Sequence, residues 1–432
     1  MGISEASEPP DSRRASRPPS VGDGGQPSFR QVLGTPRFFP LFAAGAVSRW
    51  GDNIARVTLA AVVFERTGSA MATGITFAVS LVPSVFGRSL LGPLVDRMPV
   101  RRLLILAHLL RAACVAVLIG LVAASAPVWA LLLAVFVLEM LGGPASPADM
   151  VLLTQLFTVP RFYGRAMALT ALSEQVNQAV GFALGGTAVA LLGPRAALGV
   201  DLLSFLVGAV VVRLYAPGVA APSPPSSGLR GFARELTEAG AYLVGHRVLL
   251  PLVVLSMIAS VAIAAPEAAA IPYAAGRAQE GGLLMGSLMA GATLGLVPLG
   301  RLPVERSSRF VVPMALLMPV PLIATAWHPP VAVTALLWLT SGALQSFMLP
   351  LQTVFALLSP AEYRGRLFGF AGAASMTAGG IAFVVTGWLA EYLDPGRAVA
   401  ILAGAALACT ALLALCWPRE EFDASVVAVR ST

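Results

Sequence analysis

Long apolar runs separated by short polar intervals dominate the sequence and constrain its fold more than any other feature. A helix needs about 20 mainly apolar residues to cross the hydrocarbon core of a bilayer. The sequence therefore predicts an all-α polytopic membrane protein with twelve transmembrane helices. The predicted helices cover residues 37–64, 71–95, 101–124, 128–150, 164–192, 195–215, 249–274, 282–302, 310–327, 331–358, 367–390 and 399–417.

The composition excludes several classes of protein. Only 12% of the residues are charged and 57% are hydrophobic, whereas a soluble domain has about 25% charged residues. The chain has no lysine, so it offers neither a P-loop lysine for nucleotide phosphates nor a lysine for a Schiff base. We therefore expect no cofactor and no ATP-driven transport by this chain alone. We also expect no enzyme activity, because the sequence shows no nucleophile–base or metal constellation.

The few cysteines and histidines are scattered over distant apolar segments and show no spacing typical of metal ligands. We therefore expect no metal site. The net charge of +7 is attributed to loops that face an anionic membrane lipid surface, and no nucleic acid partner is expected.

Arginine distribution predicts the orientation of the chain. Short loops rich in arginine stay on the cytoplasmic side of a membrane. The predicted loops on the side of the N-terminus carry most of the loop arginines. We therefore expect both termini to be cytoplasmic and the protein to lie in the inner, or plasma, membrane.

The two parts of the chain resemble each other. Residues 160–165 are similar to 360–366, and residues 193–197 are similar to 394–398, at a separation of about half the chain. Two related sets of six helices follow from this repeat. The predicted organisation is a disordered tail at 1–34, a six-helix bundle at 35–215, a linker with an amphipathic helix at 216–247, a second bundle at 248–417 and a tail at 418–432.

A polar turn at residues 92–102 joins the second and third predicted helices. It resembles the pattern G-x-L-x-D-R-x-G-R-[RK] of the major facilitator superfamily, in which Pro99 and Val100 replace the second glycine and the second basic residue. The residues that match, and that the resemblance assigns to a cytoplasmic gate, are Gly92, Leu94, Asp96, Arg97 and Arg101.

Residues 48–53, 65–69 and the pair Gly185 and Gly186 resemble the facilitator branch that contains macrolide-efflux and enterobactin-exporter proteins. This resemblance implies two pseudo-symmetric six-helix bundles with a site at the midplane between them. It also implies a monomeric secondary exporter of a drug-like or siderophore-like small molecule, driven by proton entry. An importer or lipid-moving facilitator on the same scaffold is the first alternative, and a non-transporting membrane partner or sensor is the second.

The first predicted helix carries a stripe of charge. Gly45, Arg49, Asp52 and Arg56 are spaced so that they share one face. A charge near the bilayer centre costs about 2.5–3.5 kcal/mol on insertion scales and normally faces a cavity. The stripe has one surplus positive charge, so we expect a carboxylate or an anionic substrate to neutralise it.

The candidate carboxylates are Glu139, Glu174 and Glu267. The resemblance places the first, fourth, seventh and tenth helices around the central cavity, which favours Glu139 and Glu267, with Glu174 and Gln345 as further candidates. Desolvation favours a protonated carboxyl and a neighbouring arginine favours an ionised one. Asp52 or Glu139 is therefore a candidate proton carrier, although a static ion pair would explain the same residues.

Two further polar residues fall within predicted helices. Arg111 and Asp201 are both expected to form structural contacts. The gate residue Asp96 is expected to stabilise one state from the cytoplasmic side, near the start of the eleventh helix.

Overall fold

The computed structural model describes residues 27–218, 228–360, 362–419 and 421–422, with the backbone alone for residues 84, 85, 88–97, 228–233, 235 and 236. All regular secondary structure in these residues is helical. The predicted all-α architecture is therefore confirmed for the described residues.

The first half begins with the short helix α1 (Phe29–Leu33) and continues with six helices. These are α2 (Phe38–Thr67), α3 (Ala70–Arg97), α4 (Val100–Ala123), α5 (Val128–Gly142), α6 (Ala145–Leu156) and α7 (Pro160–Tyr215), the last of which crosses twice. Gly193, at φ 78°, breaks α7, because this left-handed conformation suits glycine and Pro194 follows it. Pro144 likewise separates α5 from α6.

The second half follows α8 (Gly228–Gly245). Its elements are α9 (Leu249–Tyr273), α10 (Ala278–Leu299), α11 (Val304–Ser307), η1 (Ser308–Phe310), α12 (Val311–Leu317), α13 (Pro319–Ile323), η2 (Ala324–Trp327), α14 (Val331–Gln345), α15 (Met348–Leu358), α16 (Arg364–Tyr392) and α17 (Pro395–Leu415). The ninth crossing is divided into short pieces because its prolines, such as Pro313 and Pro319, lack the N–H that continues a helix.

Several predicted helix ends were wrong. The predicted helix at 310–327 extends back to Val304, whereas the one at 282–302 agrees with α10 (Ala278–Leu299) to within four residues at each end. The predicted helix at 128–150 continues to Leu156. The polar residues that follow Val304 were predicted as loop, because hydropathy alone does not mark where a helix begins.

Among the described residues, nine helical stretches are long and apolar enough to cross a membrane. One of them, Pro160–Tyr215, has 56 residues and is long enough for two crossings. The helices α2 and α3, of 30 and 28 residues, also have the length of a crossing. The structure is therefore consistent with the twelve predicted crossings.

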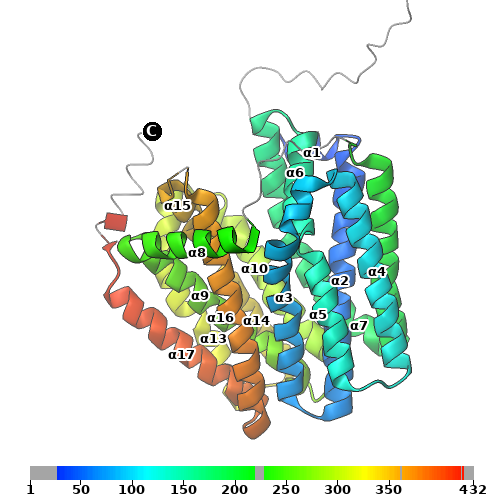
Figure 1. Cartoon of the computed structure of the whole chain (residues 1–432). Coiled ribbons are helices and arrows are strands. Elements are labelled where there is room, and N and C mark those ends of the chain that lie inside the picture. Colours follow the sequence, from blue (N-terminus) through cyan, green and yellow to red (C-terminus); the bar gives the residue numbers. More distant parts are fainter. Residues whose placement is uncertain (1–26, 219–227, 361, 420, 423–432) are drawn as a thin grey trace, which may run out of the picture.

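The helices form two bundles that lie side by side (Figure 1). The helices α2 to α7 form one bundle and α9 to α17 form the other, with α3 of the first beside α16 of the second. The helix α8 lies across one end of the second bundle. We call this end of the molecule the α8 end, and the opposite end, where α2 meets α3 and α16 meets α17, the far end.

Close helix crossings join the two halves toward the far end. A Cβ atom added to Gly282 in α10 would lie 2.6 Å from the carbonyl oxygen of Phe182 in α7. A Cβ atom added to Gly387 in α16 would lie 2.8 Å from the carbonyl oxygen of Ala70 in α3. Small residues at such positions let the backbones approach closely.

A hydrogen-bonded contact reinforces the closure of the far end. Glu391 of α16 accepts hydrogen bonds from the Ser69 hydroxyl, at 3.0 Å, and from the Met71 backbone N–H, at 3.1 Å. The Met71 N–H lies in the first turn of α3, where helical N–H groups have no acceptor within the helix. A carboxylate of the second half therefore caps a helix of the first half.

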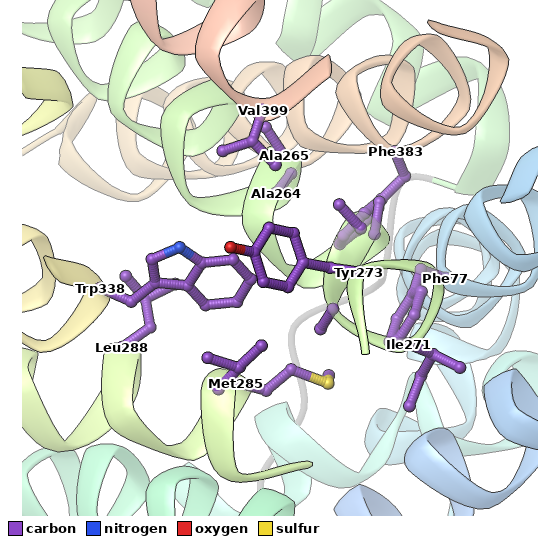
Figure 2. Close-up of a cluster of buried hydrophobic side chains, with 14 of the residues drawn as sticks. Phe77, Ala264, Ala265, Ile271, Tyr273, Met285, Leu288, Trp338, Phe383 and Val399 are labelled. Carbon is purple, nitrogen blue, oxygen red and sulfur yellow. The ribbon is translucent and has the colours of Figure 1, made fainter. Parts of the chain in front are cut away.

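A buried apolar cluster also spans the two halves (Figure 2). Phe77 of α3 stacks on Phe383 of α16, with ring centroids 5.5 Å apart. Tyr273 and Leu288 of the second half pack around Trp338, which is fully buried. The burial of these large side chains stabilises the contact between the bundles.

Candidate functional site

The α2 stripe lines a cavity of about 540 Å³ within the first half. Helices α2, α4, α5, α6 and α7 supply most of its wall, and we call it the first-half cavity. Arg49, Asp52 and Arg56 all line it. The other ionisable residues on its wall are His108, Arg111, Glu139, Asp149 and Glu174.

Each charge of the stripe has a partner on a different helix. Arg49 pairs with Glu174 of α7 at 3.2 Å. Arg56 lies 3.7 Å from Glu139 of α5. Glu174 and Glu139, which the sequence analysis named as candidates, therefore form ion pairs with the stripe and link α2 to α7 and α5.

Asp52 is paired with a residue of the third crossing. Its Oδ1 accepts a hydrogen bond from Arg111 Nη2 of α4 at 2.9 Å. The Arg111 guanidinium also lies over the ring of Phe205, 4.4 Å from the centroid. The sequence indicated a structural contact for Arg111, but it did not indicate that Asp52 is the partner.

Asp201 of α7 is fully buried behind this ion pair. Its Oδ1 lies 3.5 Å from the Ser204 hydroxyl, and its Oδ2 has no hydrogen-bond partner among the described residues. A Cβ atom added to Gly51 of α2 would lie 2.5 Å from Asp201 Oδ1. The position of Asp201 thus depends on a glycine at the crossing of α2 and α7.

Asp149 is a cavity residue that the sequence did not reveal. It lies in α6, lines the first-half cavity near Arg49 and Glu174, and forms no ion pair with the described residues. The predicted helix ended at residue 150, and Asp149, one residue before that end, was not among the candidate carboxylates. The extension of α6 to Leu156 places it inside the cavity wall.

A second cavity of about 220 Å³ lies between the two halves, and we call it the inter-half cavity. Helices α2, α3 and α7 of the first half and α9 and α16 of the second half form its wall. Phe77, Phe182 and Phe383 supply aromatic surface. The polar residues on its wall are Arg56, Ser80, Gln178, Ser260, Glu267 and Ser375.

Glu267 is the carboxylate of the inter-half cavity. It is 8% exposed and forms no hydrogen bond or ion pair with the described residues. Arg56 lines both cavities and interacts electrostatically with both Glu139 and Glu267. The two cavities therefore share one charged residue, Arg56, which lies with Leu81 and Met376 on both walls.

The remaining predicted residues lie elsewhere or are described in part. Gln345 ends α14 and lines neither of these two cavities. Arg101 donates a hydrogen bond to the carbonyl oxygen of Arg213, within the first half. The side chains of the other predicted gate residues lie outside the described residues. These are Gly92, Leu94, Asp96 and Arg97.

No group of three or more His, Cys, Asp and Glu side chains in the described part of the chain is arranged to hold a metal ion. The carboxylates around the first-half cavity are instead interleaved with arginines. Such an arrangement can exchange protons and ion-pair partners, and it can attract a charged solute.

Comparisons with known proteins agree with the fold. The sequence profile described as Major Facilitator Superfamily matches residues 41–277. A search of curated protein sequences gave no match.

Solved structures match over nearly the whole chain. A crystal structure of the nucleoside transporter NupG has a TM-score of 0.65 at 14% identity and covers 90% of this chain and 99% of its own. A bacterial homologue of the iron transporter ferroportin, in an inward-facing state, has a TM-score of 0.63 at 14% identity, with 92% and 100% covered. The POT family transporter PepTSo has a TM-score of 0.68 at 12% identity, with 90% and 98% covered.

Proposed function

Because the chain belongs to the Major Facilitator Superfamily and is a secondary transporter of that kind, we propose that it exports a drug-like or siderophore-like small molecule in exchange for protons. The two halves rock about the inter-half cavity, which opens to each side of the membrane in turn. The protein works as a monomer in the plasma membrane, with both termini in the cytoplasm.

The contacts between the halves at the far end support alternating access. Two glycine crossings and the Glu391 cap join the halves at the far end. With the termini in the cytoplasm, this arrangement is an inward-facing state.

Glu139 is the carboxyl that we assign to proton coupling. The hydrogen bond between Asp52 and Arg111 is short, and the Arg111 guanidinium also forms a cation–π contact with Phe205. This pair therefore suits the role of a static ion pair that fixes the positions of its helices. The contact of Glu139 with Arg56 is longer, at 3.7 Å. Protonation of Glu139 would release Arg56 at little cost, and Arg56 faces the cavity where a substrate would bind.

The single observation that carries this proposal is the place of Arg56, which pairs with a carboxylate in one cavity and lines the other. Charged residues at membrane depth generally mark proton relays and substrate paths. A proton taken up by Glu139 and a substrate held between the halves would therefore act on the same side chain.

Transport in oriented vesicles tests the proposal. Everted and right-side-out vesicles containing the protein are supplied with a panel of toxic compounds under an imposed pH gradient. We expect accumulation in everted vesicles that depends on the gradient and is abolished by Glu139→Gln. The matched variant is Glu362→Gln, at an exposed position before α16, which should transport normally.

Accumulation in right-side-out vesicles would instead identify an importer, and gradient-independent movement of lipid probes would identify a lipid-moving facilitator. Absence of transport of every compound by a folded protein would favour the sensor. The proposed gate role of Asp96 is tested in the same assay, where unchanged proton-coupled efflux by Asp96→Asn would refute it.

A further inference from the structure

We propose that the inter-half cavity binds an organic cation, in which a protonated amine or quaternary ammonium group pairs with Glu267 and lies against phenylalanine rings. This inference rests on the proposed transport function and names the substrate class of the same site. It follows from the charge balance, the hydrogen-bonding pattern and the aromatic wall of the cavity.

The charge balance of the two cavities favours a positive ligand. All three arginines on the cavity walls are paired, with Glu174, Glu139 and Asp52 as their respective partners. Glu267 and Asp149 are left without an ion-pair partner among the described residues. The surplus positive charge that the α2 stripe suggested is therefore reversed once the other helices are included.

Glu267 is the unpaired carboxylate between the halves. A buried charge without a partner is costly, and a bound cation would offset that cost. Among the described side chains, the charged residue that faces Glu267 is Arg56 of α2. The other packed helices contribute neutral polar groups, namely Ser80 of α3, Gln178 of α7 and Ser375 of α16.

The hydroxyl groups of the cavity are arranged as acceptors. Ser80 donates its hydroxyl hydrogen to the Thr76 carbonyl oxygen at 2.9 Å. Ser260 donates to the Ser256 carbonyl oxygen at 3.0 Å. Because each hydrogen is already used within its own helix, the oxygen lone pairs are what remains for a ligand. Oxygen lone pairs attract a cationic head group, either through the N–H groups of a protonated amine or through the positively polarised N-methyl groups of a quaternary ammonium ion, and they do not suit an anion.

Aromatic rings complete the site. Phe77 and Phe383 come from opposite halves and stack on each other, and Phe182 lies on the same wall. A cation over an aromatic face gains about 0.5–2 kcal/mol. Since the rings and Glu267 belong to both halves, the proposed site is complete only while the halves are together around it.

The size of the cavity limits the bound group. Its volume of about 220 Å³ is below the roughly 300–1,000 Å³ of usual ligand pockets. A compact amine with one ring therefore occupies the inter-half cavity. A larger molecule would extend into the first-half cavity past Arg56, Leu81 and Met376, which line both.

Equilibrium binding to the full-length purified protein tests this inference without any gradient. The probe is radiolabelled benzyltrimethylammonium, and the competitors are unlabelled benzyltrimethylammonium, the neutral isostere neopentylbenzene and the anion benzoate. We expect saturable binding that is displaced by the cation alone. Glu267→Gln should weaken it at least tenfold, whereas Glu362→Gln should bind as the unchanged protein does.

Displacement by the neutral or anionic competitor as effectively as by the cation would overturn the inference. Binding that is unchanged in a folded Glu267→Gln variant would overturn it as well. If that variant does not fold, the ranking of the three competitors on the unchanged protein decides the question. Failure to bind the cation, together with proton-coupled efflux of other compounds in vesicles, would refute the cation site and leave the transport function standing.

Discussion

Substituting Gly282 by alanine tests whether the far end is a contact that must separate during transport. The added Cβ would lie 2.6 Å from the Phe182 carbonyl oxygen and 2.8 Å from both the N and the Cα of Gly186. All three are backbone atoms of α7, so no flexible side chain can give way. Ordinary contact begins near 3.4 Å, and α7 and α10 must therefore move apart by about 0.8 Å.

The energetic cost of this movement falls on one state. Overpacking of a tight contact costs about 1–3 kcal/mol, and a state in which the far end is open would not bear that cost. The ratio of open to closed molecules should then rise roughly 5- to 150-fold. The higher helix propensity of alanine, worth about 1 kcal/mol over glycine, applies to both states and cancels.

The Met71 amide is the reporter for this experiment. Its N–H is donated to Glu391 across the two halves, and α7 and α10 cross at another place in the interface. Hydrogen exchange of an amide follows the population of the open form. We therefore expect exchange at Met71 to accelerate by about the same factor as the change in population.

A matched control is Gly404→Ala in α17, where an added Cβ meets nothing within 4 Å. This variant should leave exchange at Met71 unchanged. Exchange at Met71 that stays slow in a folded Gly282→Ala protein would refute the account of the far end. So would equal acceleration in the control.

Three further predictions concern contacts within one half. In Gly51→Ala the added Cβ would lie 2.5 Å from the Asp201 carboxylate, which forces α2 away from α7 within the first half. This variant should lower the thermal midpoint without accelerating hydrogen exchange at Met71. Faster exchange at Met71 would contradict the assignment of this contact to one half. Asp52→Asn leaves the Arg111 guanidinium buried without its carboxylate, at a cost of up to about 3–5 kcal/mol, and the thermal midpoint should recover in part when Arg111 is also replaced by methionine. Glu238→Gln breaks the contact with Arg366 that fastens α8 to α16 and the contact with Arg234 within α8, each worth about 0–1 kcal/mol. Proteolysis of α8 should therefore become faster at low salt, and an unchanged rate would show that apolar packing alone holds α8 on the bundle.

The overall fold was accessible from the sequence because hydropathy reports membrane crossings directly. The apolar runs predicted the all-α architecture, and the spacing of Arg49, Asp52 and Arg56 predicted a face that the structure places on a cavity wall. The first prediction depends on the length of each apolar run, and the second on periodicity within one helix. Helix ends were less accurate, since polar first turns such as the one at Val304 belong to helices despite their composition.

The pairing of the charges could not be predicted, because it depends on how helices distant in sequence are rotated against each other. The sequence indicated which carboxylates were available, but not that Asp52 would pair with Arg111 or that Glu267 would have no partner. It likewise missed Asp149, whose place follows from the length of α6. The anionic substrate suggested by the stripe alone lost its basis once these partners were known.

Linker residues were predictable in outline. The pattern in 216–247 predicted an amphipathic helix, and α8 occupies residues Gly228–Gly245. Ala239 and Leu243 of α8 are buried in the apolar core of the second half. The sequence did not indicate that Glu238 would also pair with Arg366 of α16, because that contact depends on where α8 lies on the bundle.

The most direct test of proton-coupled alternating access measures distances at both ends of the molecule as the pH changes. After replacement of the native cysteines, one pair of spin labels is placed at the far end, at Glu65 and Tyr392, and another at the α8 end, at Arg161 and Leu302, all of which are exposed. We predict that lowering the pH shifts the two distance distributions in opposite directions, and that Glu139→Gln produces the low-pH distributions at every pH. Distances that do not change with pH at either end, or that respond to pH equally in Glu139→Gln, would contradict the account.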